Sequence, residues 1–255
     1  MKLGCLPYLN VRPLVHTLEN GGLPAGYEFV YAPPSKLARM LATGEIAAAP
    51  VSSFATFIDP RLEICPGICI AADGPVKSVL VLSKVPPEQI RTVALDTSSL
   101  SGANMTRIIL AESFGLEPAF IHSDPDPARM LEHADAALVI GDPAMQCSKD
   151  GLHVLDLAEE WKKLTGLPAV FAVWAGQGIT PELIDLLQDA KREGLSMLPE
   201  IAQSECARLD LPYELCYEYL SEIMVYDMGE REQQALQVFR EKAAAHGLID
   251  LVGAG

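Results

Sequence analysis

The sequence predicts an α/β protein with two lobes, and three features lead to this prediction. Apolar segments of strand length alternate with helix-like segments as far as Trp174. Two long apolar strands, at residues 77–83 and 169–175, enclose a middle segment that has its own strand–helix–strand units. The remainder of the chain, from Thr180 onward, has an almost entirely helical pattern.

A chain with this pattern leaves one lobe, builds a second and returns, so that the two crossing strands act as a hinge. We therefore assign residues 1–85 plus 174–255 to lobe 1, which includes the helical C-terminal tail, and residues 86–173 to lobe 2.

The individual elements follow from apolar runs and from their stop signals. The helix predicted at residues 34–44 places Leu37, Met40 and Leu41 on one face and ends at Gly44. Further helices are predicted at 101–115, ending at a glycine, and at 180–198, 199–211, 212–223 and 229–247. Strands, mostly parallel, are predicted at 3–6, 27–31, 46–51, 68–72, 77–83, 92–96, 119–122, 136–141 and 169–175.

Composition excludes several classes of protein. The formal net charge of −15 repels nucleic acid and anionic membranes, and no basic cluster offsets it. No apolar run approaches the ~18 residues that a membrane-spanning helix needs. Met1 leads directly into a strand without the apolar region of a signal peptide, so we expect a cytoplasmic protein. The six cysteines form no CxxC pair and do not cluster with histidine, which favours buried reduced thiols over a metal site.

Polar residues after the predicted strands are the candidate ligand-binding groups. Asn10 follows the first strand and is either a turn residue or an amide that contacts a ligand. Ser52 and Ser53 follow another strand, where they either cap a helix or bind an anion. Ser78 alternates with Lys77 at the start of the first crossing strand, and we expect Ser78 to face inward.

The segment 97–104, TSSLSGAN, gives the clearest signal for an anion site. Four hydroxyls and a glycine gather where a helix begins, and the free N–H groups and dipole of a helix N-terminus favour an anion. One serine suffices as the helix cap, so Ser99, Ser101 and the amides of Gly102 and Ala103 are candidates for binding a carboxylate.

Two further residues have competing interpretations. Asp142 is either a helix cap or a carboxylate that binds a hydroxyl, and Trp174 is either a core residue or part of the ligand-binding surface. The motifs GxSxG, HExxH, GxGxxG after a strand and GxxxxGK[ST] are absent. The chain is therefore interpreted either as a binding protein or as an enzyme that chiefly positions its substrate, and no metal site is expected.

The sequence resembles the chorismate dehydratase family of the futalosine route to menaquinone. The resemblance extends from residue 1 to about residue 176 and rests on the order and spacing of PYLNVRPL, PSKLARMLATGEI, VSS, DGPVKSVLVLSK, DTSSLSGANMTRIIL, VIGDPAM and DLAEEWKKLTGLPAVFAVW. It implies the fold of type II periplasmic binding proteins, used inside the cell by a lyase that needs no cofactor. The substrate would be chorismate and the product 3-[(1-carboxyvinyl)oxy]benzoate.

The resemblance also suggests roles for the candidate residues. Asn10 and Ser78 would act directly on the substrate, and the segment around Ser99 and Ser101 would bind one carboxylate while Ser52 and Ser53 bind the other. The substrate's own enolpyruvyl carboxylate is an attractive base, with Asp142 as the alternative.

Two positions depart from the family pattern. Ala47 stands where an acidic residue is usual, and Gly102 stands where a hydroxyl residue is usual. These changes leave open a non-catalytic binding protein for small carboxylates. The sister enzyme 1,4-dihydroxy-6-naphthoate synthase shares the fold, although TGLPAVFAVW and YLN favour chorismate dehydratase. The acidic helical tail is either solvent-exposed surface or a homodimer contact.

Overall fold

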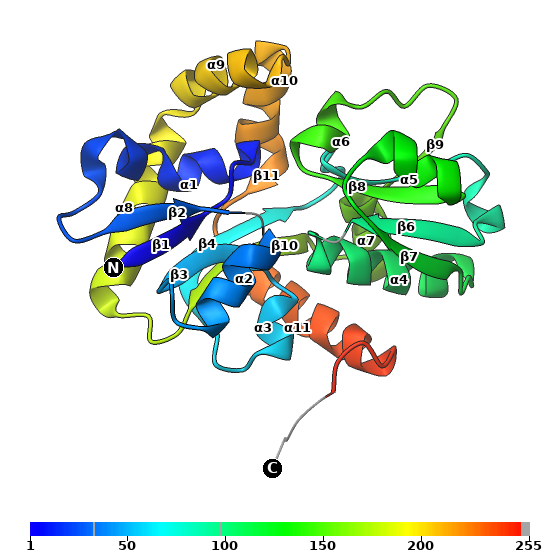
Figure 1. The fold of residues 1–255 in the computed structure, drawn as a ribbon, viewed down its shortest axis with the longest axis horizontal. Coiled ribbons are helices and arrows are strands. Elements are labelled where there is room, and N and C mark those ends of the chain that lie inside the picture. Colours follow the sequence, from blue (N-terminus) through cyan, green and yellow to red (C-terminus); the bar gives the residue numbers. More distant parts are fainter. Residues whose placement is uncertain (33, 97, 251–255) are drawn as a thin grey trace. The chain divides into compact units, whose positions relative to one another are not determined.

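The computed structural model describes residues 1–32, 34–96 and 98–250. They form two α/β units, each with its own sheet (Figure 1). Unit 1 comprises Met1–Ala71 and Val170–Gly229, whereas unit 2 comprises Ala72–Ala169 and continues from Glu230. The chain therefore passes from one unit to the other three times.

Unit 1 is built on a six-stranded sheet with the order β11-β4-β10-β3-β1-β2. Its strands are β1 (Lys2–Cys5), β2 (Glu28–Tyr31), β3 (Ala48–Ser52), β4 (Glu63–Ala72), β10 (Ala169–Gly176) and β11 (Met224–Val225). β1 runs parallel to β2 and β3, so the carboxyl ends of these strands lie at the same edge of the sheet. β10 runs antiparallel to β3 and places Trp174 opposite Pro50.

Helices cover the sheet of unit 1, and glycines allow two close approaches. The helices are α1 (Arg12–Thr17), α2 (Pro34–Ala42), α3 (Ala55–Ile58), α8 (Pro181–Ser196), α9 (Leu198–Leu209) and α10 (Tyr213–Glu218). A Cβ added to Gly4 of β1 would lie 2.8 Å from a methyl of Leu37, so this face of β1 packs tightly against α2. α8 packs against α1 at Gly194, where an added Cβ would lie only 1.8 Å from the carbonyl oxygen of Pro13.

Unit 2 is built on a five-stranded sheet with the order β7-β6-β8-β5-β9. Its strands are β5 (Val79–Ser83), β6 (Thr92–Asp96), β7 (Ala119–Ser123), β8 (Ala136–Ile140) and β9 (His153–Asp156). β6 runs parallel to β7 and β8, and β5 runs antiparallel to β8 and β9. The carboxyl ends of β6 and β8 therefore meet the amino end of β5 at one edge.

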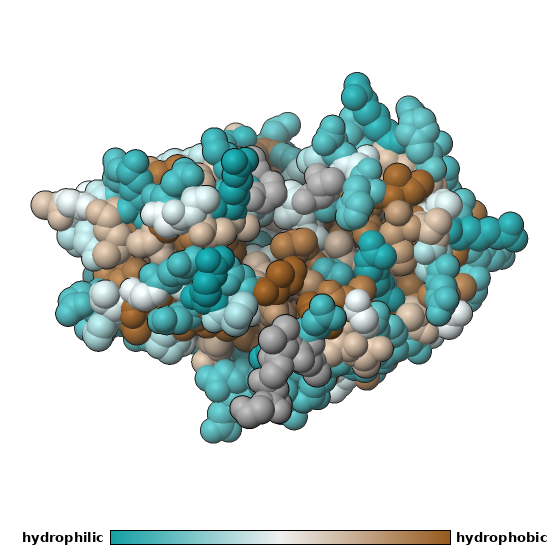
Figure 2. All heavy atoms as spheres, turned by 60° about the horizontal axis from the view of Figure 1, so that its bottom comes forward, coloured by the Kyte–Doolittle hydropathy of each residue, from teal (hydrophilic) through white to brown (hydrophobic). Residues whose placement is uncertain are grey.

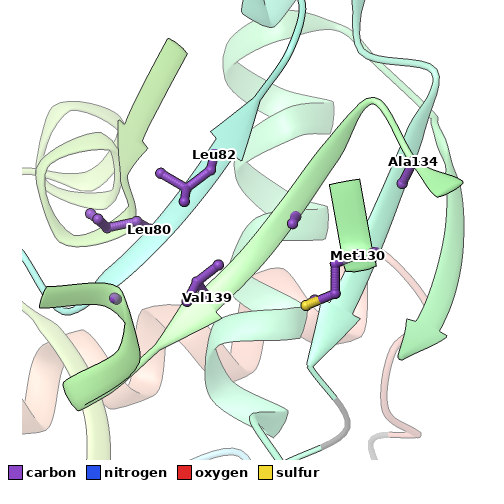
Figure 3. Packing of buried hydrophobic residues seen from close by; sticks show 8 residues of the cluster. Leu80, Leu82, Met130, Ala134 and Val139 are labelled. Atoms are coloured by element: carbon purple, nitrogen blue, oxygen red, sulfur yellow. The ribbon is translucent and has the colours of Figure 1, made fainter. Parts of the chain in front are cut away.

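The helices of unit 2 are α4 (Leu100–Phe114), α5 (Pro127–His133), α6 (Asp142–Gln146), α7 (Leu157–Thr165) and α11 (Glu230–Ala245). Figure 3 shows the core on one face, where Met130 of α5 and Ala134, which directly follows that helix, pack with the apolar side chains of β5 and β8. The fully buried ring of Trp161 in α7 meets that of Phe239 in α11 edge to face, with centroids 5.3 Å apart. This contact and the packing of α11 on α4 join the C-terminal helix to unit 2.

The observed units differ from the predicted boundaries in three places. Residues 72–85 and the C-terminal helix were assigned to lobe 1, whereas both belong to unit 2. β5 belongs there because it pairs with β8 and β9, and α11 belongs there because Phe239 packs on Trp161. The C-terminal boundary of the middle segment lies at Val170 rather than at Trp174.

The sheets are also more mixed than the sequence predicted. The two strands expected to cross between lobes, β5 and β10, both lie antiparallel to neighbours. Two consecutive strands can pair in parallel only if a crossover connection within the same sheet joins them. The chain enters β5 and β10 from the other unit, so no such connection precedes either strand. The short strands β9 and β11 were not predicted.

The surface carries side chains of differing hydropathy. Figure 2 shows hydrophilic and apolar side chains intermixed on the visible face. Within the described part of the chain, no helix combines the length and the hydropathy that crossing a membrane requires.

Candidate functional site

Asn10 lies in a single helical turn, Leu9–Val11, directly after β1. Leu9 and Val11 on either side of it are fully buried and anchor the turn, whereas Asn10 is half-buried. No hydrogen bond joins the Asn10 side chain to another described residue, and its φ is not in the left-handed region. The turn therefore does not depend on the amide, which remains accessible at the carboxyl edge of the sheet of unit 1.

Ion pairs hold the backbone around Asn10. The Arg12 guanidinium, 12% exposed, binds Glu19 and lies 3.9 Å from Glu205. Glu205 also pairs with Arg208 at 2.6 Å, and Arg208 donates to the carbonyl oxygen of Pro7 at 3.2 Å. The charge of Arg12 is thus matched by two carboxylates, so its structural role is to fix the turn.

Glu19 raises the pKa of two neighbouring groups. Burial, followed by the negative charge of Glu19, raises the pKa of the Cys5 thiol to about 12. Burial and a hydrogen bond to the same carboxylate also raise the pKa of Tyr31. Cys5 is therefore a protonated thiol at neutral pH and not a nucleophile.

The serines after β3 have different environments. Ser53 is fully buried, and its hydroxyl donates to the carbonyl oxygen of Val170 at 2.6 Å, which ties β3 to β10. Ser52 is half-buried at the end of the strand. The N-cap position of α3 is occupied by Phe54 and not by either serine.

Trp174 belongs to the core of unit 1. It is 1% exposed, and its indole N–H has no hydrogen-bond partner among the described residues. Of the two interpretations of this residue, core or ligand-binding surface, burial supports the first. A substrate contact by Trp174 stays a prediction, and its low exposure places the residue with the core.

In unit 2, the structure brings four predicted segments to one edge of the sheet. Asp96 ends β6, Gly141 follows β8, and Ser78 precedes the antiparallel β5 that pairs with β8. The N–H of Gly141 donates to the carbonyl oxygen of Ser78 at 2.7 Å. α4 begins at the same edge, because a Cβ on Gly102 would lie 3.5 Å from Val79 and 3.4 Å from Leu138.

Ser99 is the N-cap of α4, as one serine of the segment was predicted to be. Its hydroxyl oxygen accepts from the N–H of Gly102 at 3.2 Å, and its carbonyl oxygen accepts from the N–H of Ala103 at 3.1 Å. These two amides are therefore engaged in the cap itself. The hydroxyl proton of Ser99 has no acceptor among the described residues, and Ser101 beside it is 3% exposed.

The other polar residues of this segment bond locally. Ser98 donates both its N–H and its hydroxyl to Asp96, at 2.7 and 2.6 Å, and Asn104 donates to the carbonyl oxygen of Leu100. Thr97, the first hydroxyl residue of the predicted anion-binding segment, lies outside the described residues. The anion-attracting features of the segment thus reduce to Ser99, Ser101 and the helix end.

Asp142 does not cap a helix. The N-cap of α6 is Gly141, and Asp142 is the first residue inside that short helix, 7% exposed. Gly141 has φ 66° and ψ −149°, a conformation that needs glycine. Asp142 thus directly follows the residue whose N–H bonds the carbonyl oxygen of Ser78.

Ser78 is 1% exposed, which agrees with the expectation that it faces inward. Lys77 does not alternate with it along a strand, because β5 begins only at Val79 and Lys77 has a left-handed φ of 63°. Ser78 therefore follows a tight turn.

Sequence reasoning missed Asp156, which organises this turn. It caps α7 and also accepts hydrogen bonds from the N–H groups of Val76 and Lys77. Burial raises the pKa of its carboxyl, and the backbone N–H donors oppose that effect. The local signal was the spacing of Asp156 and Glu159, which is typical of a helix start.

The cysteines and the potential metal ligands have the following environments. All six cysteines are free, and only Cys147 is not buried. In the described part of the chain, no group of three or more histidine, cysteine, aspartate or glutamate side chains could hold a metal ion.

Comparison with known proteins identifies the family. A family model described as "Menaquinone biosynthesis" matches residues 1–245. The chain belongs to this menaquinone biosynthesis family. A relative from Thermus thermophilus, named chorismate dehydratase, is 31% identical over 260 residues and covers 94% of this chain and 93% of its own. The chorismate dehydratase of Campylobacter jejuni is 26% identical, with 97% of this chain and 100% of the relative covered.

Solved structures share the fold of this member of the menaquinone biosynthesis family. Protein AF1704 from Archaeoglobus fulgidus has a TM-score of 0.77 at 18% identity, covering 97% of this chain and 98% of its own. The periplasmic aliphatic sulphonate binding protein SsuA from Escherichia coli has a TM-score of 0.65 at 15% identity, covering 98% and 88%. The predicted periplasmic-binding-protein-like fold is confirmed.

Proposed function

We propose that this chain is a chorismate dehydratase, which converts chorismate to 3-[(1-carboxyvinyl)oxy]benzoate and water in the futalosine route to menaquinone. The observation that carries the proposal is the end-to-end similarity to a chorismate dehydratase, 31% identical across 94% of this chain. The free thiols fit a reducing compartment, so the proposal includes a cytoplasmic location.

The proposed reaction needs no external oxidant or reductant. The ring carbon that bears the enolpyruvyl ether loses a proton, and the neighbouring carbon loses its hydroxyl group. The electron pair of the broken C–H bond forms the new C=C bond, and the proton and hydroxide leave as one water. Since the ring becomes aromatic, the protein has only to bind, orient and assist proton transfer.

Asn10 is assigned a direct role on the substrate. Its amide can donate a hydrogen bond to the departing hydroxyl or to a carboxylate. The supporting observations are its half-buried position and the lack of a hydrogen bond from its side chain to any described residue. An anchored turn between Leu9 and Val11 keeps the amide in one place, which favours a preorganised donor.

Ser78 is the second proposed catalytic group, and the start of α4 is the proposed carboxylate site. Ser99 can donate its hydroxyl proton to a carboxylate while its oxygen still accepts from Gly102, so the helix cap survives binding. Ser101 and the positive end of the helix dipole add to the attraction. Ser52 is assigned to the other carboxylate, and the role of Ser53, whose hydroxyl bonds Val170, is to hold β3 in place.

The base is assigned to the enolpyruvyl carboxylate of chorismate itself, with Asp142 as the protein alternative. Asp142 is buried at the same sheet edge as Ser78, so it is the protein group considered as the base beside the substrate's own carboxylate. Turnover by Asp142→Asn separates them. A rate within about twofold of the unchanged protein assigns the proton to the substrate carboxylate, whereas a loss of 10²-fold or more assigns it to Asp142.

The departure at Ala47 does not favour a non-catalytic binding protein. Ala47 precedes β3 and donates its N–H to the carbonyl oxygen of Lys2, at the amino ends of β1 and β3. Asn10 and Ser52 follow the carboxyl ends of these strands. Strands rise about 3.3 Å per residue, so four or five residues separate Ala47 from that edge by more than 10 Å.

The departure at Gly102 has a steric explanation. A Cβ at this position would lie 2.6 Å from the Ser99 hydroxyl oxygen, so the glycine allows Ser99 to cap α4. A hydroxyl residue there would compete with the cap.

The proposal is tested by incubating the purified protein with chorismate alone and separating the products by chromatography. Formation of 3-[(1-carboxyvinyl)oxy]benzoate without an added cofactor, and above a no-protein control, is the expected result. Chorismate that binds without turning over would replace the proposal with a non-catalytic carboxylate-binding protein. If chorismate is neither bound nor converted, the substrate of 1,4-dihydroxy-6-naphthoate synthase would be tested next.

A further inference from the structure

The Asp156 carboxylate accepts backbone hydrogen bonds from two distant parts of unit 2. Its two oxygens accept from the N–H of Val76 at 3.0 and 2.9 Å, and one of them accepts from the N–H of Lys77 at 2.7 Å. The other oxygen caps α7, accepting from Ala158 at 3.1 Å and Glu159 at 3.3 Å. The residue is 8% exposed, so little water competes for these bonds.

The bonds to Val76 and Lys77 hold an unusual backbone conformation. Lys77 has a φ of 63°, which residues other than glycine rarely adopt, because the Cβ approaches the carbonyl oxygen that follows. Its N–H is the donor of the shortest of the five bonds to Asp156. This bond to Asp156 helps to offset the steric cost of the Lys77 conformation.

Ser78 follows this turn directly and is fixed on its other side. Its carbonyl oxygen accepts from Gly141, whose own positive φ leads into Asp142. Two backbone anchors therefore contribute to the orientation of Ser78: the turn at Lys77 before it and the hydrogen bond from Gly141. The turn at Lys77 is held by a side chain, that of Asp156.

We infer that Asp156 is a positioning residue for Ser78, acting by holding Lys77 in the left-handed conformation. The inference rests on the proposed function, since Ser78 is the group assigned to the substrate. Helix capping alone does not explain the residue, because one oxygen suffices for the cap and the second oxygen bonds only Val76 and Lys77. A carboxylate is needed because it serves both segments at once.

The two functions of Asp156 can be separated by substitution. Asp156→Ser retains an oxygen that can cap α7 but is too short, and has too few acceptors, to hold the turn. Asp156→Asn retains the size of the side chain but replaces one carboxylate oxygen by an NH2 group. That group cannot accept a hydrogen bond from the backbone N–H groups that face it. Both variants are expected to lower kcat for chorismate by tenfold to a hundredfold, with KM changed less than about threefold, since displacing a catalytic group by an ångström costs this much.

A double-mutant cycle with Ser78→Ala tests whether the effect passes through Ser78. If Asp156 acts by positioning Ser78, the change Asp156→Ser costs less than about twofold once Ser78 is alanine. Lys77→Gly supplies the rescue, because glycine adopts the left-handed conformation without the steric cost. In the Asp156→Ser background it should recover at least threefold in kcat.

Asp135 provides the matched control. It also accepts two backbone hydrogen bonds, from Arg91 at 2.9 Å and Thr92 at 3.0 Å, but it precedes β8 and so lies at the opposite edge of the same sheet from Ser78. Asp135→Asn is expected to lower the melting temperature while leaving kcat within twofold. A loss of kcat in the control equal to that in Asp156→Asn would mean that general destabilisation explains both.

Amide hydrogen exchange measures whether Asp156 holds the turn at Val76 and Lys77, independently of enzymatic activity. The amides of Val76 and Lys77 are expected to exchange at least tenfold faster in Asp156→Ser than in the unchanged protein, and Lys77→Gly alone should not accelerate Val76. Unchanged exchange, or a Ser78→Ala cycle in which the losses multiply, would overturn the inference. If the unchanged protein fails to convert chorismate, the proposed function fails, and the exchange rates still decide whether Asp156 holds the turn.

Discussion

Replacing Asn10 with alanine separates a ligand-binding amide from a turn residue. The side chain has no hydrogen bond to a described residue and no left-handed backbone to support, so its removal takes little from the folded state. We expect the free energy of unfolding to change by less than about 0.5 kcal/mol, as for a surface substitution. The melting temperature should then move by no more than about 2 °C.

The effect on catalysis should be far larger. A donor aimed at charge that develops in the transition state contributes about 2.7–4 kcal/mol, which corresponds to a loss of 10²–10³ in rate for Asn10→Ala. The assay is steady-state conversion of chorismate, alongside thermal unfolding of the same preparation. Because the charge of Arg12 is already matched by Glu19 and Glu205, that guanidinium is not expected to substitute for the amide.

Asn20 supplies the control, because its amide has a structural bond. Its Nδ2 donates to the carbonyl oxygen of His16 at 2.7 Å. Asn20→Ala should therefore cost about 0.5–1.5 kcal/mol of stability and leave turnover within twofold. The reasoning fails if Asn10→Ala lowers stability as much as Asn20→Ala does while turnover per folded molecule is unchanged. Asn10 would then be a turn residue.

Three further predictions concern caps, charges and thiols. Ser99→Ala removes the cap of α4 and should cost about 1 kcal/mol, with a rise in KM for chorismate; an unchanged KM would remove Ser99 from the carboxylate site. Partial burial alone would raise the pKa of Glu112, but its bonds from Lys242 and His246 hold that pKa below its usual value. The stability that this carboxylate adds is present above its unfolded pKa of about 4.3 and is lost as pH falls through the lower folded value. In urea unfolding, Glu112→Gln should be less stable by up to about 1 kcal/mol at pH 7, with the difference vanishing in acid; a constant difference would contradict the pairing. With a thiol reagent at pH 8, Cys147 should react before the buried cysteines, whereas early modification of Cys5 would contradict its raised pKa.

The architecture was largely predictable because its signals are local. Strands such as β6 and β8 are short apolar runs, and α2 and α4 are followed by Gly44 and Gly115, which have positive φ values. Thr180 and Pro181 start α8 as their residue types predict. β9 was missed because His153 and Val154 are exposed at an edge of the sheet, so the segment lacks the apolar run of a buried strand.

The candidate site was predictable only as a set of segments. Strand ends followed by Asn10, Ser52 and Ser99 are visible in the sequence, because ligand-binding groups in such folds follow strands. The tertiary structure then showed how their environments differ. Trp174 proved to be a core residue and the Ser53 hydroxyl bonds Val170, neither of which a residue type can reveal.

The sequence by itself determined the alternation of strands and helices, the acidic surface, the unpaired thiols and the family motifs, since each depends on residue type and short-range spacing. The tertiary structure alone decided that α11 completes unit 2, that Lys77 is left-handed and that Asp156 holds it. Val76 and Asp156 are separated by 80 residues, and their hydrogen bonds exist only because β5 and β9 pair in one sheet. A contact of this kind depends on register across the fold, which no local pattern encodes.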